Sequence, residues 1–91
     1  MRERLYLGVD LGGSAIKAGV VDADGRILST NQRPTEAKRG KRHVLEGLAA
    51  LCSEMMEAAG DRKTDVCAVG VGVPGMVDAG NGHVFSAPNL F

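Results

Sequence analysis

The chain has 91 residues, of which 44% are hydrophobic and 3% aromatic, and its 11 Lys and Arg residues equal its 11 Asp and Glu residues. This length and composition predict one small α/β domain with a modest core, and they exclude a disordered chain. The balanced charge and the scarcity of base-stacking side chains argue against nucleic acid as a partner, and no apolar run approaches the roughly 18 residues that span a bilayer.

The first four residues, Met1 to Arg4, lead directly into an apolar run without the pattern of a signal peptide. Cys52 and Cys67 fall in a helix pattern and a strand pattern, and they lack the spacing of a metal-binding or redox pair. We therefore expect buried thiols, a cytoplasmic location and no membrane partner.

Two apolar runs, residues 5–9 and 16–21, are joined by a short segment that contains Gly12 and Gly13. Large apolar and β-branched residues favour strands, and the connection is too short for a helical crossover, so these runs predict an antiparallel hairpin. Twin glycines allow positive φ and leave backbone N–H groups accessible to an anionic oxygen. The turn is a candidate phosphate-binding loop, with an ordinary hairpin turn as the alternative on turn chemistry alone.

Three side chains around this turn add to the candidate site. Ser14 offers a hydroxyl donor, and Lys17 on the returning strand offers positive charge. Asp10 would repel bare phosphate, but its carboxylate could hold hydrated Mg²⁺ that accompanies a nucleotide. Its alternative role is to cap the strand end, and we favour the indirect Mg²⁺ role because the glycine turn follows directly.

Residues 23–26 form a turn signal before a third expected strand at residues 27–33, which completes an antiparallel meander. Residues 34–40 lack periodicity and predict a loop. From residue 44 to residue 59 the apolar side chains recur at three- and four-residue steps, which predicts the main helix, with Gly60 as a left-handed cap. The members of this apolar stripe are Val44, Leu45, Leu48, Leu51, Cys52, Met55 and Ala59.

The continuously apolar run within residues 65–72 predicts a central strand covered on both faces. A right-handed crossover through the helix would place this strand parallel to the first strand and beside it. Asn81-Gly82 is the strongest short hairpin signal, so residues 76–77 are expected to pair with residues 83–85. The expected fold class is therefore α/β, with a mixed sheet of a three-stranded meander plus a parallel strand, and one main helix.

Two common phosphate-loop patterns do not fit the chain. A Walker A loop needs lysine where Ser14 stands, and a helix where residues 16–21 predict a strand. The spacing Gly70-x-Gly72-x-x-Gly75 matches a Rossmann fingerprint by pattern, but Pro74 interrupts it and the following residues favour turns.

The basic cluster Lys38-Arg39-Gly40-Lys41-Arg42-His43 could contact phosphate or RNA. Such runs beside a helix start are usually solvated surface, which we favour by roughly four to one. His43 and His83 lack the partner pattern of a metal site or a catalytic triad, and we interpret both as structural or exposed.

The segment Asp10-Leu11-Gly12-Gly13-Ser14-Ala15-Ile16-Lys17-Ala18-Gly19 resembles the first phosphate motif of the superfamily of actin-like proteins, sugar kinases and heat-shock chaperone ATPases. Two further segments are similar to one family of this superfamily, the ROK family of repressors, open reading frames and sugar kinases. These segments are Val69-Gly70-Val71-Gly72-Val73-Pro74-Gly75-Met76-Val77-Asp78 and Ser86-Ala87-Pro88-Asn89-Leu90. One departure is Ala15, where many members carry lysine or another polar side chain.

The resemblance implies that residues 1–91 are the N-terminal lobe of an actin-like (ribonuclease H-like) ATPase domain whose C-terminal lobe is absent. It implies a protein that moves the γ-phosphoryl group of ATP to a hexose hydroxyl with the help of Mg²⁺, with glucose as the default sugar. Asp10, Gly12, Gly13, Ser14, Ala15 and Lys17 would hold the nucleotide phosphates or their metal.

The resemblance also implies a sugar pocket lined by Pro74, Gly75, Pro88 and Asn89. Ligands tend to sit at strand ends of open α/β sheets, and Asn offers both a donor and an acceptor to a hydroxyl. The alternatives are a strand terminator at Pro74-Gly75 and a plain turn at Pro88-Asn89.

By the same resemblance, the catalytic aspartate, the second phosphate loop, the adenosine pocket and a zinc cluster would lie beyond Phe91. We therefore assign no catalytic residue and expect this segment alone not to phosphorylate sugar. An unfinished sheet with exposed edges would favour a homo-oligomer.

Two alternatives come from other functional classes. The first is a ROK transcriptional regulator, which would carry a helix-turn-helix ahead of the glycine turn, where only Met1 to Arg4 precede the strand. The second is a non-catalytic nucleotide-binding or assembly module.

Overall fold

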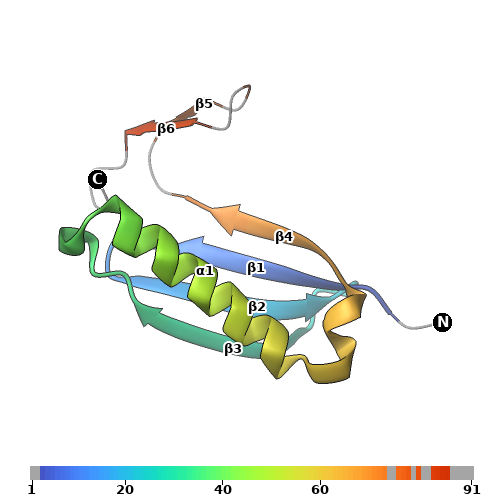
Figure 1. Ribbon diagram of the computed structural model, residues 1–91. Coiled ribbons are helices and arrows are strands. Elements are labelled where there is room, and N and C mark those ends of the chain that lie inside the picture. The colour runs from blue at the N-terminus through green and yellow to red at the C-terminus, as the bar shows by residue number, and fades with distance from the viewer. Residues whose placement is uncertain (1–2, 74–75, 79, 81–82, 87–91) are drawn as a thin grey trace.

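The computed structural model describes residues 3–73, 76–78, 80 and 83–86. Its main sheet contains the four strands β1 (Leu5–Leu11), β2 (Ala15–Asp22), β3 (Ile27–Pro34) and β4 (Val66–Gly72), in the order β3-β2-β1-β4. The first three strands form an antiparallel meander, and β4 lies parallel to β1. The mixed sheet expected from the sequence is therefore confirmed (Figure 1).

One face of this sheet is covered by helix α1 (Lys41–Ala58), which runs along the strands (Figure 1). The short 3₁₀ helices η1 (Ala37–Arg39) and η2 (Gly60–Asp65) lie before and after α1. The chain leaves the meander after β3 and returns through α1, which allows β4 to enter beside β1 in the parallel direction.

The core lies between α1 and the sheet. Cα partners in an antiparallel pair carry side chains on the same face, so Val9 lies beside Ala18 and Leu11 beside Ile16. Alternate residues of β1 and β2 are therefore buried, as a half-buried sheet requires. The buried hydrophobic residues of the described chain are Leu5, Leu7, Val9, Leu11, Ile16, Ala18, Val20, Val44, Leu51 and Met55.

The helix differs from its prediction at the start and on one side chain. It begins at Lys41, three residues before the predicted start at residue 44. The prediction missed the first turn because that turn is polar and carries no apolar periodicity. Leu45 is 48% exposed, since a residue next to the buried Val44 points about 100° away around the helix axis. Gly60 adopts the expected left-handed conformation with φ of 62°.

The segment predicted as a loop at residues 34–40 is more ordered than its sequence indicates. Its first residue ends β3, and residues 37–39 form η1. A single 3₁₀ turn is too short to produce a hydrophobic periodicity, which is why the pattern did not reveal it.

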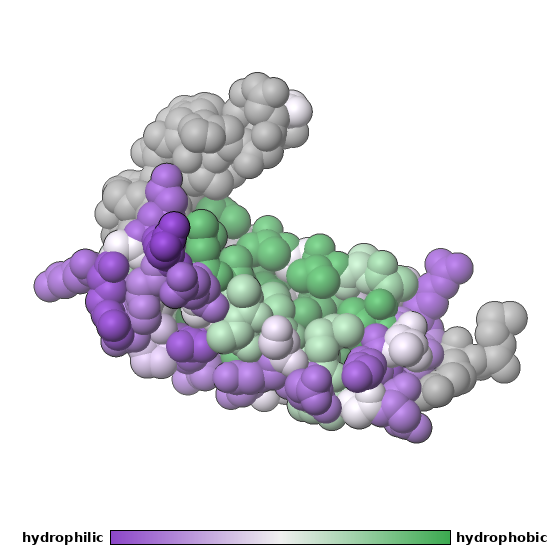
Figure 2. All heavy atoms as spheres, viewed as in Figure 1, coloured by the Kyte–Doolittle hydropathy of each residue, from purple (hydrophilic) through white to green (hydrophobic). Residues whose placement is uncertain are grey.

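Strand β4 lies at the edge of the sheet, and its prediction as a central strand covered on both faces is wrong for the described chain. Val69 is 54% and Val71 is 44% exposed, because α1 packs over β1, β2 and β3. Among the described residues, β1 is the one strand that pairs with β4 in the sheet. Cys67 is likewise exposed and Cys52 only half-buried, which corrects the expectation of two buried thiols. Figure 2 shows hydrophobic surface beside α1 on this face.

A second sheet pairs β5 (Met76–Asp78) with β6 (His83–Ser86) in antiparallel fashion, which confirms the predicted hairpin. Its Asn81-Gly82 turn lies outside the described residues. Among the helices of the described chain, none combines the length and the apolar character that crossing a membrane requires.

Candidate functional site

The turn between β1 and β2 consists of Gly12, Gly13 and Ser14 and lies at the tip of a hairpin. The N–H of Gly12 donates to the carbonyl oxygen of Ala15 at 3.0 Å and closes the turn. The next two amides, those of Gly13 and Ser14, have no hydrogen-bond partner among the described residues. These two adjacent N–H groups are the part of the turn that remains available to an anion.

The twin glycines do not adopt the positive φ expected for them, which the described chain shows at Gly25, Gly40 and Gly60. Gly12 is required for a different reason, since a Cβ atom there would lie 2.8 Å from the carbonyl oxygen of Ala15. The close approach of two backbone segments, rather than a left-handed conformation, therefore explains this glycine.

Thr35 clamps the turn from the end of β3, and sequence reasoning missed it. Its hydroxyl donates to the carbonyl oxygen of Gly12 at 2.6 Å, and its N–H donates to that of Ser14 at 3.0 Å. The residue is 1% exposed, so both bonds are shielded from water. The sequence signal was slight: a single threonine after Pro34, in a segment without periodicity.

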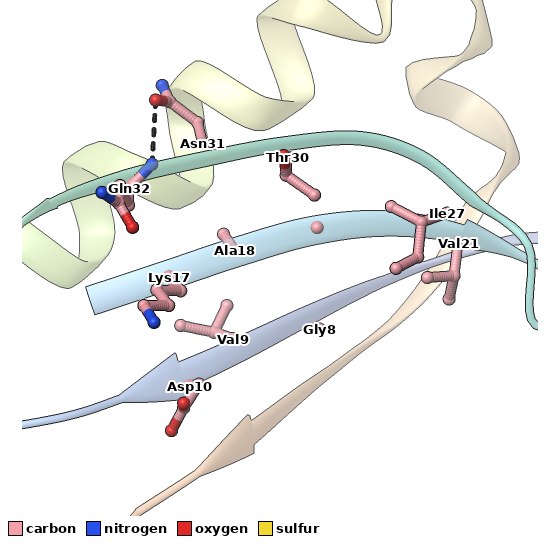
Figure 3. Close-up of a pocket in the computed structure, with 11 residues that line it drawn as sticks. Gly8, Val9, Asp10, Lys17, Ala18, Val21, Ile27, Thr30, Asn31 and Gln32 are labelled. Atoms are coloured by element: carbon pink, nitrogen blue, oxygen red, sulfur yellow. Dashed lines mark hydrogen bonds between the residues drawn. The ribbon is translucent and has the colours of Figure 1, made fainter. Parts of the chain in front are cut away.

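Asp10 and Lys17 are Cα partners across β1 and β2 and lie on the face of the sheet opposite α1. Figure 3 shows both side chains on this open face. Both residues are exposed, and neither makes an ion pair within the described chain. Together with Gly8 and Gly19 they line a hollow of about 820 Å³. A free carboxylate and a free ammonium group thus lie next to the turn.

A second hollow, of about 620 Å³, opens between the turn and η1. It is lined by Gly13, Ser14, Pro34, Glu36, Ala37, Lys38 and Arg39. The predicted site residues are therefore divided, with Asp10 and Lys17 on one side of the turn and Gly13 and Ser14 at the other hollow. Ala15 begins β2 and lines neither of these two hollows.

Glu36, at the rim of the second hollow, has a left-handed backbone with φ of 54°. Its carboxylate lies 2.9 Å from Nε2 of His43 and 3.6 Å from the guanidinium of Arg39. The hydrogen bond with His43, aided by the charge of Arg39, holds the pKa of the Glu36 carboxyl below its ordinary value. His43 thus has the structural role expected for it.

The four residues predicted to line the sugar pocket, Pro74, Gly75, Pro88 and Asn89, lie outside the described residues. They stay predictions from the sequence.

Known proteins match almost the whole chain. The family model of the ROK family matches residues 6–91. The glucokinase of Thermotoga maritima is 36% identical over 84 residues, which are 92% of this chain and 25% of that protein. A putative xylose repressor of Caldicellulosiruptor sp. is 30% identical over 86 residues, which are 94% of this chain and 22% of that protein.

Among solved structures, the ROK family glucokinase of Streptomyces griseus in complex with glucose and AMPPNP superposes with a TM-score of 0.80 at 41% identity, covering 94% of this chain and 25% of that one. The chain thus spans about a quarter of the length of the relatives it matches. From the family match and this shared architecture, we conclude that the chain belongs to the ROK family and has the fold of its sugar kinases.

Proposed function

We propose that this chain supplies the phosphate-binding turn of an ATP-dependent hexose kinase. The observation that carries the proposal is the pair of amides at Gly13 and Ser14, which have no partner in the part of the chain that the structure describes and lie in a turn held by Thr35. Adjacent backbone N–H groups can hold phosphate oxygens by hydrogen bonds that need no cationic side chain. The glucokinases among its relatives support this use of the turn.

The residues around the turn have separate roles in this proposal. The amides of Gly13 and Ser14 bind phosphate oxygens, and the exposed Ser14 hydroxyl adds a donor. Lys17 offsets phosphate charge on the open face. Phosphoryl transfer depends mainly on such positioning and charge stabilisation.

Asp10 is the proposed contact for Mg²⁺, through water. Magnesium keeps several waters and uses one or two carboxylates together with substrate phosphates, so a single exposed carboxylate beside the turn fits it. Bound Mg²⁺ would supply neutralisation of phosphate charge. Zinc is proposed only for the part of the protein outside residues 1–91.

For the sugar we propose glucose, because the named kinase relatives include glucokinases. Pro74, Gly75, Pro88 and Asn89 remain the proposed contacts to its hydroxyls. We assign the catalytic base to polypeptide outside residues 1–91, so these residues alone are expected not to phosphorylate glucose.

A ROK transcriptional regulator is the second candidate, because the putative xylose repressor matches 94% of this chain. A regulator would bind sugar without binding Mg·ATP. The use of the turn by nucleotide therefore separates the two candidates.

Isothermal titration calorimetry of the 91-residue chain with Mg·AMPPNP and with glucose tests the proposal. We expect Mg·AMPPNP to bind, and Asp10→Asn to weaken that binding in the presence of Mg²⁺. Glu57→Gln removes one exposed carboxylate of α1 and serves as the matched control. Glucose binding without nucleotide binding would favour the regulator, and the absence of both would favour a structural module.

Two properties of the whole protein complete the proposal. We propose a cytoplasmic location, where ATP is available as a donor.

We also propose self-association through the open edge of β4, beside the exposed Val69 and Val71. Sedimentation velocity over a range of concentrations would detect the dimer, and Val69→Lys is expected to abolish it.

A further inference from the structure

The hollow lined by Gly13 and Ser14 is completed by cations that the sequence pattern assigned to solvated surface. Lys38 and Arg39 of η1 also line it. Lys38 makes no ion pair within the described chain. The Arg39 side chain stays 63% exposed, although its guanidinium lies 3.6 Å from Glu36. Two cationic groups are therefore accessible beside the free amides of the turn.

The backbone that carries these cations is fixed against the turn. Thr35, only three residues before Lys38, is bonded to both Gly12 and Ser14. The N–H of Arg39 then donates to the carbonyl oxygen of Glu36 at 2.9 Å, which closes η1. Thr35 therefore fixes the backbone just before Lys38 and Arg39 as well as the backbone of the turn.

The charges around the hollow are unfavourable without an anion. Gly40 separates η1 from helix α1, whose first turn contains Arg42 but neither an acidic residue nor a side-chain cap. A helix N-terminus carries partial positive charge, so cations there repel it. Among the described residues that line the hollow, Glu36 is the only acidic one, and its carboxylate lies beside both His43 and Arg39. A bound anion would relieve this repulsion.

We propose that Lys38 and Arg39 form, together with the amides of Gly13 and Ser14, one binding surface for a linear phosphoanhydride chain. The inference rests on the proposed function, because both place phosphate at the turn. It adds that η1 provides charge for phosphate groups that lie beyond the two amides. The guanidinium of Arg39 suits bidentate contact with a phosphate, and the ammonium of Lys38 acts as a point charge.

Two ligands carry this chemistry, a nucleoside triphosphate and inorganic polyphosphate. Calorimetric titrations of the 91-residue chain at low salt with Mg·AMPPNP and with sodium tripolyphosphate distinguish them. Lys38→Gln and Arg39→Gln are each expected to raise the Kd for tripolyphosphate roughly 1.5- to 5-fold, as exposed charge pairs do, and this difference should shrink as salt is added.

Two further variants test whether charge in this hollow is the cause. Lys63→Gln removes one exposed cation from η2, which lies at the other end of α1 (Figure 1). This substitution should leave the Kd unchanged. Glu36→Gln removes the negative charge from the hollow and should lower the Kd. Circular dichroism spectra identical to that of the wild type would show that each variant is folded.

The outcomes separate this inference from the proposed function. Weakened binding of both ligands by Lys38→Gln and Arg39→Gln assigns the surface to the nucleotide triphosphate, and weakened binding of tripolyphosphate alone assigns it to inorganic polyphosphate. Unchanged binding of both ligands in these variants would overturn the inference and leave the proposed function standing. An equal effect of Lys63→Gln would also overturn it. If the folded wild type binds neither ligand, the proposed function fails too.

Discussion

Replacing Thr35 by valine tests whether the clamp on the glycine turn stabilises the fold and the site. Valine has nearly the same shape, so no cavity forms, but the 2.6 Å hydrogen bond to the carbonyl oxygen of Gly12 is lost. The net value of such a bond and the cost of an acceptor left partly without a partner together give about 1–2 kcal/mol. For a domain of this size, each kcal/mol lowers the Tm by about 4–8 °C.

Urea unfolding followed by circular dichroism gives the stability, and calorimetry with Mg·AMPPNP gives the effect on the site. We expect Thr35→Val to lose both stability and affinity, because the amides of Gly13 and Ser14 are no longer held in place. Thr30→Val on the exposed face of β3 makes the same chemical change and should stay within about 0.5 kcal/mol of the wild type. If Thr35→Val is as stable as Thr30→Val, the clamp does not stabilise the turn.

Three further predictions concern other groups. Gly12→Ala places a Cβ atom 2.8 Å from a backbone carbonyl oxygen, so urea unfolding should show a loss of about 1–3 kcal/mol. Because the hydrogen bond with His43 lowers the pKa of Glu36, the Glu36–His43 pair stabilises the fold fully above pH 4.5, the ordinary carboxyl pKa. This stabilisation is lost as the pH falls through the lowered pKa. The urea midpoints of wild type and Glu36→Gln should accordingly converge on acidification, and midpoints that stay equally far apart would contradict it. Burial raises the pKa of the Cys52 thiol, so a thiol reagent at neutral pH should modify the exposed Cys67 first, as mass spectrometry of the labelled peptides would show.

The features that the sequence predicted are those fixed by local patterns. Alternating apolar residues in β1 and β2 define the buried face, and twin glycines between them define the hairpin. The parallel placement of β4 followed from the helix between the third and fourth strands. In each case the neighbours along the chain supply the physical cause, so the pattern is visible without coordinates.

The features that it did not predict depend on contacts between distant residues. Thr35 and Gly12 are 23 positions apart, and a lone threonine carries no signal that its hydroxyl will meet a particular carbonyl. The exposure of Val69 and Val71 depends on what packs over the face of β4, whereas the apolar run gives information only on the strand itself.

At the hairpin tip, the groups that close the turn differ from the groups that are proposed to bind phosphate. Residues that do not contact the ligand can therefore affect the site. The N–H of Gly12 donates to Ala15 and closes the turn, and the carbonyl oxygens of Gly12 and Ser14 accept hydrogen bonds from Thr35. Among the described residues, the N–H groups of Gly13 and Ser14 have no hydrogen-bond partner. The carbonyl group of Gly13 is then the one carbonyl of this short stretch that has no partner and could repel phosphate. Because Thr35 follows β3 directly, substitutions that shift the end of β3 against β2 should change phosphate affinity even though β3 itself makes no proposed contact with the ligand.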